Sequence, residues 1–370
     1  MLTRRHLLAG AAAGSAALLL PGTASAATTG PDTATEQGWL DWIAAHRHDV
    51  SVLIDDGAGR RAARDADVDR VMASSIKVVH LSAYATAVAE GRLDPNEMIR
   101  VGDWDAHHPF VGDGRAHFQA LNSLAIPCDD YGIAKDPEQR VPLKRLVESM
   151  IFFSDNAATD YLRTRLGDPA LRFAAARGGW FRPDTRSLGG EILMLIMPEY
   201  APPPGSPAAV RRAMGDAVAR RFVADPAFRA EALRRWPEMP MTPETQWPWI
   251  KGHGQGSATD LFALHHSLAT DRYRPGGALA REILARPLSD RVPAGASEVL
   301  FKGGSLPFSL TFGLSVRWPG GRSGTAALLL TGVNEQAMRN AAVLIYYVVE
   351  ALADPAKFTA LRRALGRPTV

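Results

Sequence analysis

The first residues that suggest chemistry are Ser74 and Lys77, in the run Ser-Ser-Ile-Lys at the start of a predicted helix. The apolar residues that follow recur at helical spacing, and the pattern ends at Gly91. Residues three apart in a helix share one face, so an amine at the fourth position can take the serine proton. The N-terminus of a helix also favours a developing alkoxide. Ser74 is therefore a candidate nucleophile and Lys77 its candidate base, although a solvated lysine on a surface helix gives the same short pattern.

A second candidate group is the tripeptide Ser154-Asp155-Asn156, which lies between two predicted amphipathic helices. It puts a hydroxyl and an amide on one tight turn, where both can point into a shared cleft. The alternative is a plain helix N-cap, a role that serine, aspartate and asparagine all serve.

Lys302 is the third candidate, at the end of the strand-like run that begins at Glu298. A buried strand is normally apolar at such a position. The glycines that follow, Gly303 and Gly304, allow a substrate or another backbone to approach closely. An edge lysine beside a β-turn is the alternative, so each of the three motifs is weak evidence when it stands alone.

Strand-like runs occur at both ends of the chain. The elements expected there are a helix over 36–48 and strands over 50–54, 298–301, 311–318 and 325–331. The apolar run 334–352 predicts a final helix, with Asn334 as its N-cap.

These end strands enclose a largely helical interior, an order typical of an α+β fold. We expect one antiparallel sheet formed from about 48–66 and 298–331, with an all-helical subdomain over about 73–271 inserted between its strands. Two proline-rich runs, 201–205 and 236–249, are expected to be ordered surface loops.

In this order the three motifs resemble the S-x-x-K, S-D-N and K-T-G signatures of the class A β-lactamases and their penicillin-binding relatives. The run from Leu146 to Asp160, around the second motif, also looks like that family, and Ser257-Ala-Thr-Asp-Leu resembles the start of a later family helix. The resemblance covers about residues 36–352. It implies a β-lactamase/transpeptidase-like fold and a serine hydrolase.

The resemblance also implies a role for each candidate residue. Ser74 attacks a carbonyl carbon, and Lys77 takes its proton directly or through a relay. Ser154 passes a proton to the departing nitrogen, Asn156 orients Lys77 and the substrate amide, and Lys302 supplies positive potential near a substrate carboxylate. The reaction implied is hydrolysis of a β-lactam amide through an acyl-enzyme, and it requires no metal and no organic cofactor.

An oxyanion hole is implied at the backbone N–H groups of Ser74 and Ser305, and substrate contacts are implied at Gly304 and Ser305. Position 303 departs from the family pattern, because it is glycine where threonine or serine is usual. A hydroxyl near the substrate carboxylate is then missing unless Ser305 supplies it. The substrate therefore stays open at this point.

The residue that would activate water for hydrolysis of the acyl-enzyme is the weakest match. Residues 185–195 can be laid over the family's Ω-loop so that Glu191 takes the place of its glutamate, but Leu195 then replaces the companion asparagine. An ordinary surface carboxylate is the alternative for Glu191, and Glu199 is the next candidate. Because the water site is incomplete, we expect slow hydrolysis of the acyl-enzyme.

The segment 103–139 makes the separation of Ser74 and Ser154 longer than expected for compact family members, and it is expected to form a loop beside the cleft. It contains three histidines, at positions 107, 108 and 117. Their spacing fits no compact zinc motif. We therefore expect His107, His108 and His117 to form hydrogen bonds rather than to bind a metal.

Other functions remain open for the same residues. A D-Ala-D-Ala peptidase, a related acyl hydrolase or esterase, or a slow penicillin-binding sensor would use them too, so the expected partner is a small β-lactam or a peptidoglycan-type acyl substrate. A net charge of +3 with no basic stripe argues against nucleic-acid binding. Cys128 is the only cysteine, which excludes an internal disulfide, and we expect a monomer.

The first 26 residues predict a signal peptide. Arg4 and Arg5 precede a weakly apolar core from Leu7 to Leu20, and Ala24-Ser-Ala is typical of a cleavage site. The paired arginines resemble a twin-arginine signal, with an ordinary secretory signal as the alternative. The core is shorter than the roughly 20 residues of a bilayer span. We expect export to the periplasm or the cell exterior, no later membrane span, and a hydrolase domain over 27–370.

Overall fold

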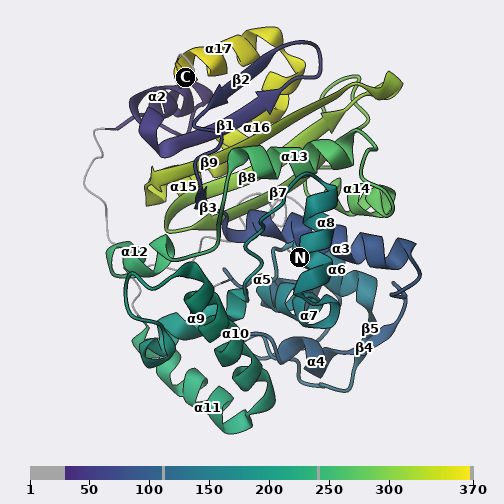
Figure 1. Ribbon diagram of the computed structural model, residues 1–370, viewed down its shortest axis with the longest axis vertical. Coiled ribbons are helices and arrows are strands. Elements are labelled where there is room, and N and C mark those ends of the chain that lie inside the picture. The colour runs from purple at the N-terminus through teal and green to yellow at the C-terminus, as the bar shows by residue number, and fades with distance from the viewer. Residues whose placement is uncertain (1–29, 111–112, 240–241, 367–370) are drawn as a thin grey trace.

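A five-stranded antiparallel sheet forms one half of the molecule and a group of helices forms the other (Figure 1). The structure is a computed structural model that describes residues 30–110, 113–239 and 242–366. The predicted signal peptide lies outside the described residues. Within the described residues, no helix is long and apolar enough to cross a membrane.

The sheet joins the two ends of the chain. Its strand order is β2-β1-β9-β8-β7, and the strands are β1 (Val50–Asp55), β2 (Arg61–Arg64), β7 (Glu298–Leu306), β8 (Phe308–Arg317) and β9 (Ser323–Val333). The first strand, β1, pairs with the last, β9, and Val52 lies opposite Leu328. The predicted α+β fold with one antiparallel sheet is confirmed.

Helices cover both faces of the sheet. One face carries α2 (Glu36–Ala45), α16 (Ala341–Ala353) and α17 (Pro355–Leu365), and the other carries α13 (Ala258–Ala269) and α14 (Gly277–Leu284) (Figure 1). Successive β9 residues alternate between the two apolar cores: Leu328 and Leu330 pack with α16, and Ala327 and Leu329 pack on the other side. This is the two-residue period of a strand that is buried on both faces.

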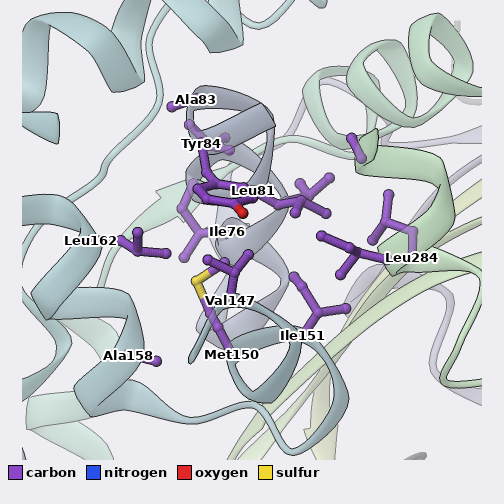
Figure 2. Packing of buried hydrophobic residues seen from close by; sticks show 14 of the residues in the cluster. Ile76, Leu81, Ala83, Tyr84, Val147, Met150, Ile151, Ala158, Leu162 and Leu284 are labelled. Carbon is purple, nitrogen blue, oxygen red and sulfur yellow. The ribbon is translucent and has the colours of Figure 1, made fainter. Parts of the chain in front are cut away.

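The helix α3 (Lys77–Ala89) runs through the centre of the helical half. It is buried around nearly its whole circumference, by α6 (Leu143–Phe152), α7 (Asn156–Leu166), α8 (Asp168–Arg177) and α14. Figure 2 shows how the apolar side chains meet: Leu81 and Tyr84 of α3 lie among Val147 and Met150 of α6, Leu162 of α7 and Leu284 of α14. This packing fixes the N-terminal end of α3, where the Ser-x-x-Lys motif lies.

Residues 187–239 and 242–251, which we call the helical insertion, contain four α-helices that lie beside this core (Figure 1). They are α9 (Leu188–Ile196), α10 (Ala208–Ala224), α11 (Pro226–Arg235) and α12 (Pro243–Lys251), with 3-10 turns at Pro198–Tyr200 and Trp236–Glu238. The insertion has an apolar cluster of its own, which includes Ile196, Phe222 and Phe228. Its two ends are tied together, because Arg186 donates a hydrogen bond to the Gly252 carbonyl at 2.7 Å.

Short elements bring the remaining segments to the same region. The strand β3 (Arg70–Val71) pairs with β6 (Gln255–Gly256). A second two-stranded sheet pairs β4 (Met98–Arg100) with β5 (Arg140–Pro142). Met72, just before the Ser-x-x-Lys motif, donates a backbone hydrogen bond to Gly254 at 3.0 Å. The end of the helical insertion therefore lies beside the start of α3.

Three expectations about local structure were wrong. The predicted helix 334–352 is two helices, α15 (Glu335–Arg339) and α16, although Asn334 does cap the first by accepting from Ala337 at 2.8 Å. The run 236–249 is mainly helical, because Thr242 caps α12 and a proline follows at the first helical position, where its missing N–H costs nothing. The segment 103–139 also contains helix, in α4 (Val101–Asp105) and α5 (Ala116–Ser123).

Candidate active site

Ser74 lies in a 3-10 turn, Ala73–Ile76, that leads directly into α3. The side-chain amine of Lys77 is 2.9 Å from Ser74 Oγ, within hydrogen-bond distance. Ser74 is 7% exposed and Lys77 is fully buried. The serine and the lysine therefore meet on one face, as the spacing predicts.

The amine of Lys77 is surrounded by acceptors from the second motif. It lies 2.6 Å from Asn156 Oδ1, 3.1 Å from Ser154 Oγ and 2.5 Å from the Ser154 carbonyl oxygen. Burial lowers the pKa of Lys77 to about 7, against the opposing effect of the Asp155, Asp113 and Asp160 charges. An amine with this pKa exists partly as the free base near neutral pH, which a general base requires.

Lys302 reaches the same group from β7. Its amine donates to Ser154 Oγ at 3.0 Å and to the Gly303 carbonyl at 2.7 Å. Burial, together with the nearby charge of Lys77, lowers the pKa of Lys302 well below its ordinary value. One hydrogen-bonded chain thus connects Ser74, Lys77, Ser154 and Lys302.

The strand β7 packs directly against the start of α3. A Cβ atom at Gly304 would lie 2.4 Å from the Ser74 backbone nitrogen, so only glycine fits there. A Cβ atom at Gly303 would lie 2.9 Å from Cζ of Phe301, whose ring fills the space beside this position. The structure thus brings Ser305 and Ser74 into one cavity wall, while position 303 contributes no side chain.

A cavity of about 20 Å³, room for about one water molecule, lies beside Ser74. Ser154, Asn156 and Ser305 line it, together with residues that the sequence analysis does not single out: Asp113, Leu188, Ile192, Trp249, His253 and Leu306. His253 lies between two glycines in the sequence, a pattern that marks a tight backbone approach and was the only signal available for it.

Comparisons with known proteins point to the same kind of site. Residues 39–188 match the model of the beta-lactamase enzyme family. Over these residues the chain is similar to the β-lactamases. No curated protein sequence matches it.

Solved β-lactamase structures share this fold at low sequence identity. A β-lactamase from Sphaerobacter thermophilus is 16% identical, with a TM-score of 0.55, and the match covers 85% of this chain and 97% of that one. A β-lactamase from Chitinophaga pinensis is 15% identical, with a TM-score of 0.54 and coverage of 86% and 99%. An ancestral class A β-lactamase is 17% identical, with a TM-score of 0.52 and coverage of 86% and 98%. The β-lactamase/transpeptidase-like fold is confirmed.

In this β-lactamase-like chain, the middle residue of Ser-Asp-Asn fixes the turn. Ser154 adopts a left-handed backbone conformation, with φ of 68°, and Asp155 then caps α7 by accepting from the Ala157 N–H at 2.8 Å. The second oxygen of Asp155 accepts from Trp104 Nε1 at 2.9 Å and lies 3.0 Å from His117 Nδ1. These contacts hold Ser154 and Asn156 against Lys77.

His117 is a buried cation between two carboxylates. Its Nε2 lies 2.8 Å from Asp105 Oδ1, and its Nδ1 lies against Asp155. Burial opposes the charge, but the two carboxylates outweigh it and raise the pKa of His117 to about 10. His108 stacks on this ring, with centroids 4.4 Å apart, and burial together with the charge of His117 lowers its pKa.

We expect His117→Leu to lower the free energy of unfolding by about 3–5 kcal/mol at pH 6, because it leaves buried carboxylates without their cation. A raised folded-state pKa gives a stabilisation that is complete below the ordinary pKa of 6.5 and is lost as pH rises through about 10. The difference between wild type and variant should therefore shrink from pH 6.5 to 10 in denaturant titrations. His108→Gln is the control and should show no such slope, and a pH-independent effect of His117→Leu would contradict the charged pair.

The three histidines do not form a metal site. His108 Nε2 donates to the Tyr131 carbonyl at 3.0 Å, and His107 stacks edge-on against Tyr161. Across residues 30–110, 113–239 and 242–366, no group of three or more histidine, cysteine or acidic side chains is placed to hold a metal ion.

The structure does not bring Glu191 to the serine. Both its carboxylate oxygens are held by arginines: Arg186 donates at 2.7 Å, and Arg211 donates at 2.6 and 2.9 Å. Its neighbours Leu188 and Ile192 line the cavity, and Glu191 does not. Both oxygens of this carboxylate are therefore already occupied by guanidinium groups. The assignment of Glu191 as the base therefore fails on geometry.

Leu195 and Glu199 do not supply the missing base. Leu195 packs in the apolar cluster of the helical insertion. Glu199 is exposed and forms an ion pair with Arg235, away from the cavity. Neither of the two glutamates proposed from the sequence is free beside Ser74.

Proposed function

We propose that this protein is an exported serine hydrolase that opens the amide bond of β-lactams through an acyl-enzyme on Ser74. The observation that carries the proposal is the hydrogen-bonded chain from Ser74 Oγ through Lys77 Nζ and Ser154 Oγ to Lys302 Nζ. Each link is short enough for proton transfer. The family match to β-lactamases supports the same reaction class.

Acylation needs one proton to move from oxygen to nitrogen. Lys77, as the free amine, takes the Ser74 proton, and Ser74 Oγ attacks the carbonyl carbon. The carbon–nitrogen bond then breaks, and the departing nitrogen takes the Ser154 hydroxyl proton, which Lys77 replaces. A substrate carboxylate beside Lys302 would pair with its amine and favour the protonated form. This sequence conserves charge and uses only residues in mutual contact.

Stopped-flow kinetics with a chromogenic cephalosporin tests the proposal. The expected trace is a burst close to one equivalent of enzyme followed by slower steady turnover, because acylation has its full set of residues and the predicted glutamate base is unavailable. A burst without any turnover would indicate a penicillin-binding sensor. Absence of both burst and turnover, with cleavage of a D-Ala-D-Ala peptide or an ester instead, would contradict the β-lactamase proposal.

Export is part of the proposal and rests on the N-terminal sequence. The precursor carries a twin-arginine-like signal, and we expect the mature protein to begin at Ala27 after cleavage. Intact mass of the protein recovered outside the cytoplasm, with the two arginines replaced by lysines as the control, checks both the site and the route.

A further inference from the structure

Hydrolysis of an acyl-enzyme requires a proton acceptor beside the ester carbonyl. Ser74 shares its cavity with two titratable side chains outside the three motifs, Asp113 and His253. Asp113 is already occupied, because both its oxygens accept backbone N–H groups at the start of α5, from Ala116 at 3.2 Å and from His117 at 3.0 Å. His253 is the group that remains.

Packing holds the imidazole of His253 in place, but its ring nitrogens have no hydrogen-bond partner among the described residues. It is 5% exposed and packs edge-on against the Trp249 ring, with centroids 4.8 Å apart. Trp249 is itself fixed, since its Nε1 donates to the Glu191 carbonyl at 2.7 Å. Among the residues that the structure describes, none forms a hydrogen bond with the His253 ring. Buried polar groups normally have a partner, so this ring is available to a water molecule or a substrate.

We propose that His253 is the general base that activates water for hydrolysis of the Ser74 acyl-enzyme. This inference rests on the proposed function. In the step, a ring nitrogen takes a proton from water, and the hydroxide oxygen adds to the ester carbonyl carbon. The tetrahedral intermediate expels Ser74 Oγ, which receives the proton held by the imidazolium of His253, either directly or relayed through the free amine of Lys77. Water is split between product and serine, and the enzyme returns to its starting state.

The surroundings of His253 keep its ring neutral. Burial is the main cause, the Arg186 and Arg211 charges add to it, and the Glu191 and Asp184 charges oppose it, so that the pKa of His253 falls to about 4. Asp113 faces the same cavity. The ring therefore keeps an acceptor lone pair throughout the neutral range, where Lys77, with its pKa of about 7, is partly protonated.

The role of Glu191 follows from the same contacts. Its carboxylate pairs with Arg186 and Arg211, and its carbonyl accepts a hydrogen bond from the indole that supports the His253 ring. Glu191 is thus a positioning residue for the base, not the base.

The test uses the full chain and a fluorescent penicillin as the acylating probe. We expect His253→Gln and His253→Ala to be labelled at a rate close to that of wild type, and the acyl-enzyme half-life to lengthen by about 10²-fold or more. Added imidazole should shorten the half-life in His253→Ala but not in His253→Gln. Glu199→Gln, a variant of an exposed glutamate on the same helical insertion, is the matched control and should have a wild-type half-life.

The pH profile of wild-type deacylation separates His253 from Lys77. A histidine base with a pKa of about 4 gives a rate that is flat through the neutral range and falls only as pH approaches that value. A Lys77 base would lose rate below about pH 7.

Three results would overturn the inference. They are an unchanged half-life in both His253 variants, loss of labelling in a folded His253→Gln protein, or a wild-type deacylation rate that falls with a midpoint near pH 7. Failure of the penicillin to label wild type would instead contradict the proposed function, so the two proposals fail on different observations.

Discussion

Ser74→Ala should abolish covalent labelling by a fluorescent penicillin and change the unfolding temperature by only a few degrees. In the proposed function this hydroxyl supplies the nucleophile, whereas Ser154, the other hydroxyl in contact with Lys77, is also bound by Lys302 and passes on a proton. Structurally the hydroxyl contributes one hydrogen bond to Lys77, which keeps its contacts with Ser154 and Asn156. The net worth of such a bond is about 1 kcal/mol.

The adjacent serine is a matched control for this variant. Ser75 is also buried, and its hydroxyl donates to the Met72 carbonyl at 2.7 Å, away from Lys77. Ser75→Ala should lose a similar amount of stability and keep full labelling. Intact-protein mass spectrometry measures both, and an adduct on Ser74→Ala, or on any other serine of wild type, would exclude Ser74 as the nucleophile.

Lys77→Met should slow acylation by about 10²- to 10⁴-fold, the usual contribution of a general base. In wild type, the acylation rate should rise as pH increases to about 7 and then level off, because Lys77 must lose its proton before it can take the one from Ser74. Stopped-flow acylation between pH 5 and 9 measures this, and the variant should show a flat profile. Lys144→Met, at a surface lysine on α6 that bonds Asn96, is the control and should behave as wild type.

The same variant should change how stability depends on pH. The pKa of Lys77 lies at about 7 in the folded protein and at 10.5 in an ordinary lysine, so the unfolded chain binds more protons between these values. Stability conferred at this position therefore rises with pH from about 7 to 10.5. Lys77→Met should remove that slope from the unfolding free energy, and an identical slope in both proteins would mean that Lys77 is charged when buried.

The sequence could predict the site residues on α3, α7 and β7 because each belongs to a short motif whose geometry is local. A helical turn brings Ser74 to Lys77, and a tight turn before α7 presents Ser154. The antiparallel sheet could be predicted for a similar reason, since strand patterns mark both ends of the chain. The motifs alone do not show that these three elements meet in space. That expectation came from the resemblance to the β-lactamases.

Glu191 and His253 show where such reasoning ends. The position of Glu191 in the sequence does not show which side chains bind its carboxylate. One of them, Arg211, lies on a different helix, α10. His253 follows the helical insertion and belongs to none of the three motifs, so the sequence does not indicate that it lies beside Ser74. Whether a polar group is free or occupied is a tertiary property, and it decides which of the two can accept a proton.

The small size of the cavity beside Ser74 has a consequence for substrate affinity. Side chains of the helical insertion, Leu188, Ile192 and Trp249, border a space that holds about one water molecule, so an acyl donor that occupies this space displaces some of them. The insertion has its own apolar cluster, and a hydrogen bond from Arg186 to Gly252 joins its two ends. It is therefore a unit that can move while the sheet stays folded. The observed affinity for every substrate is then the affinity of the open state multiplied by the fraction of molecules that are open. Selection among acyl donors, in such an arrangement, depends on the free energy of opening as much as on the fit.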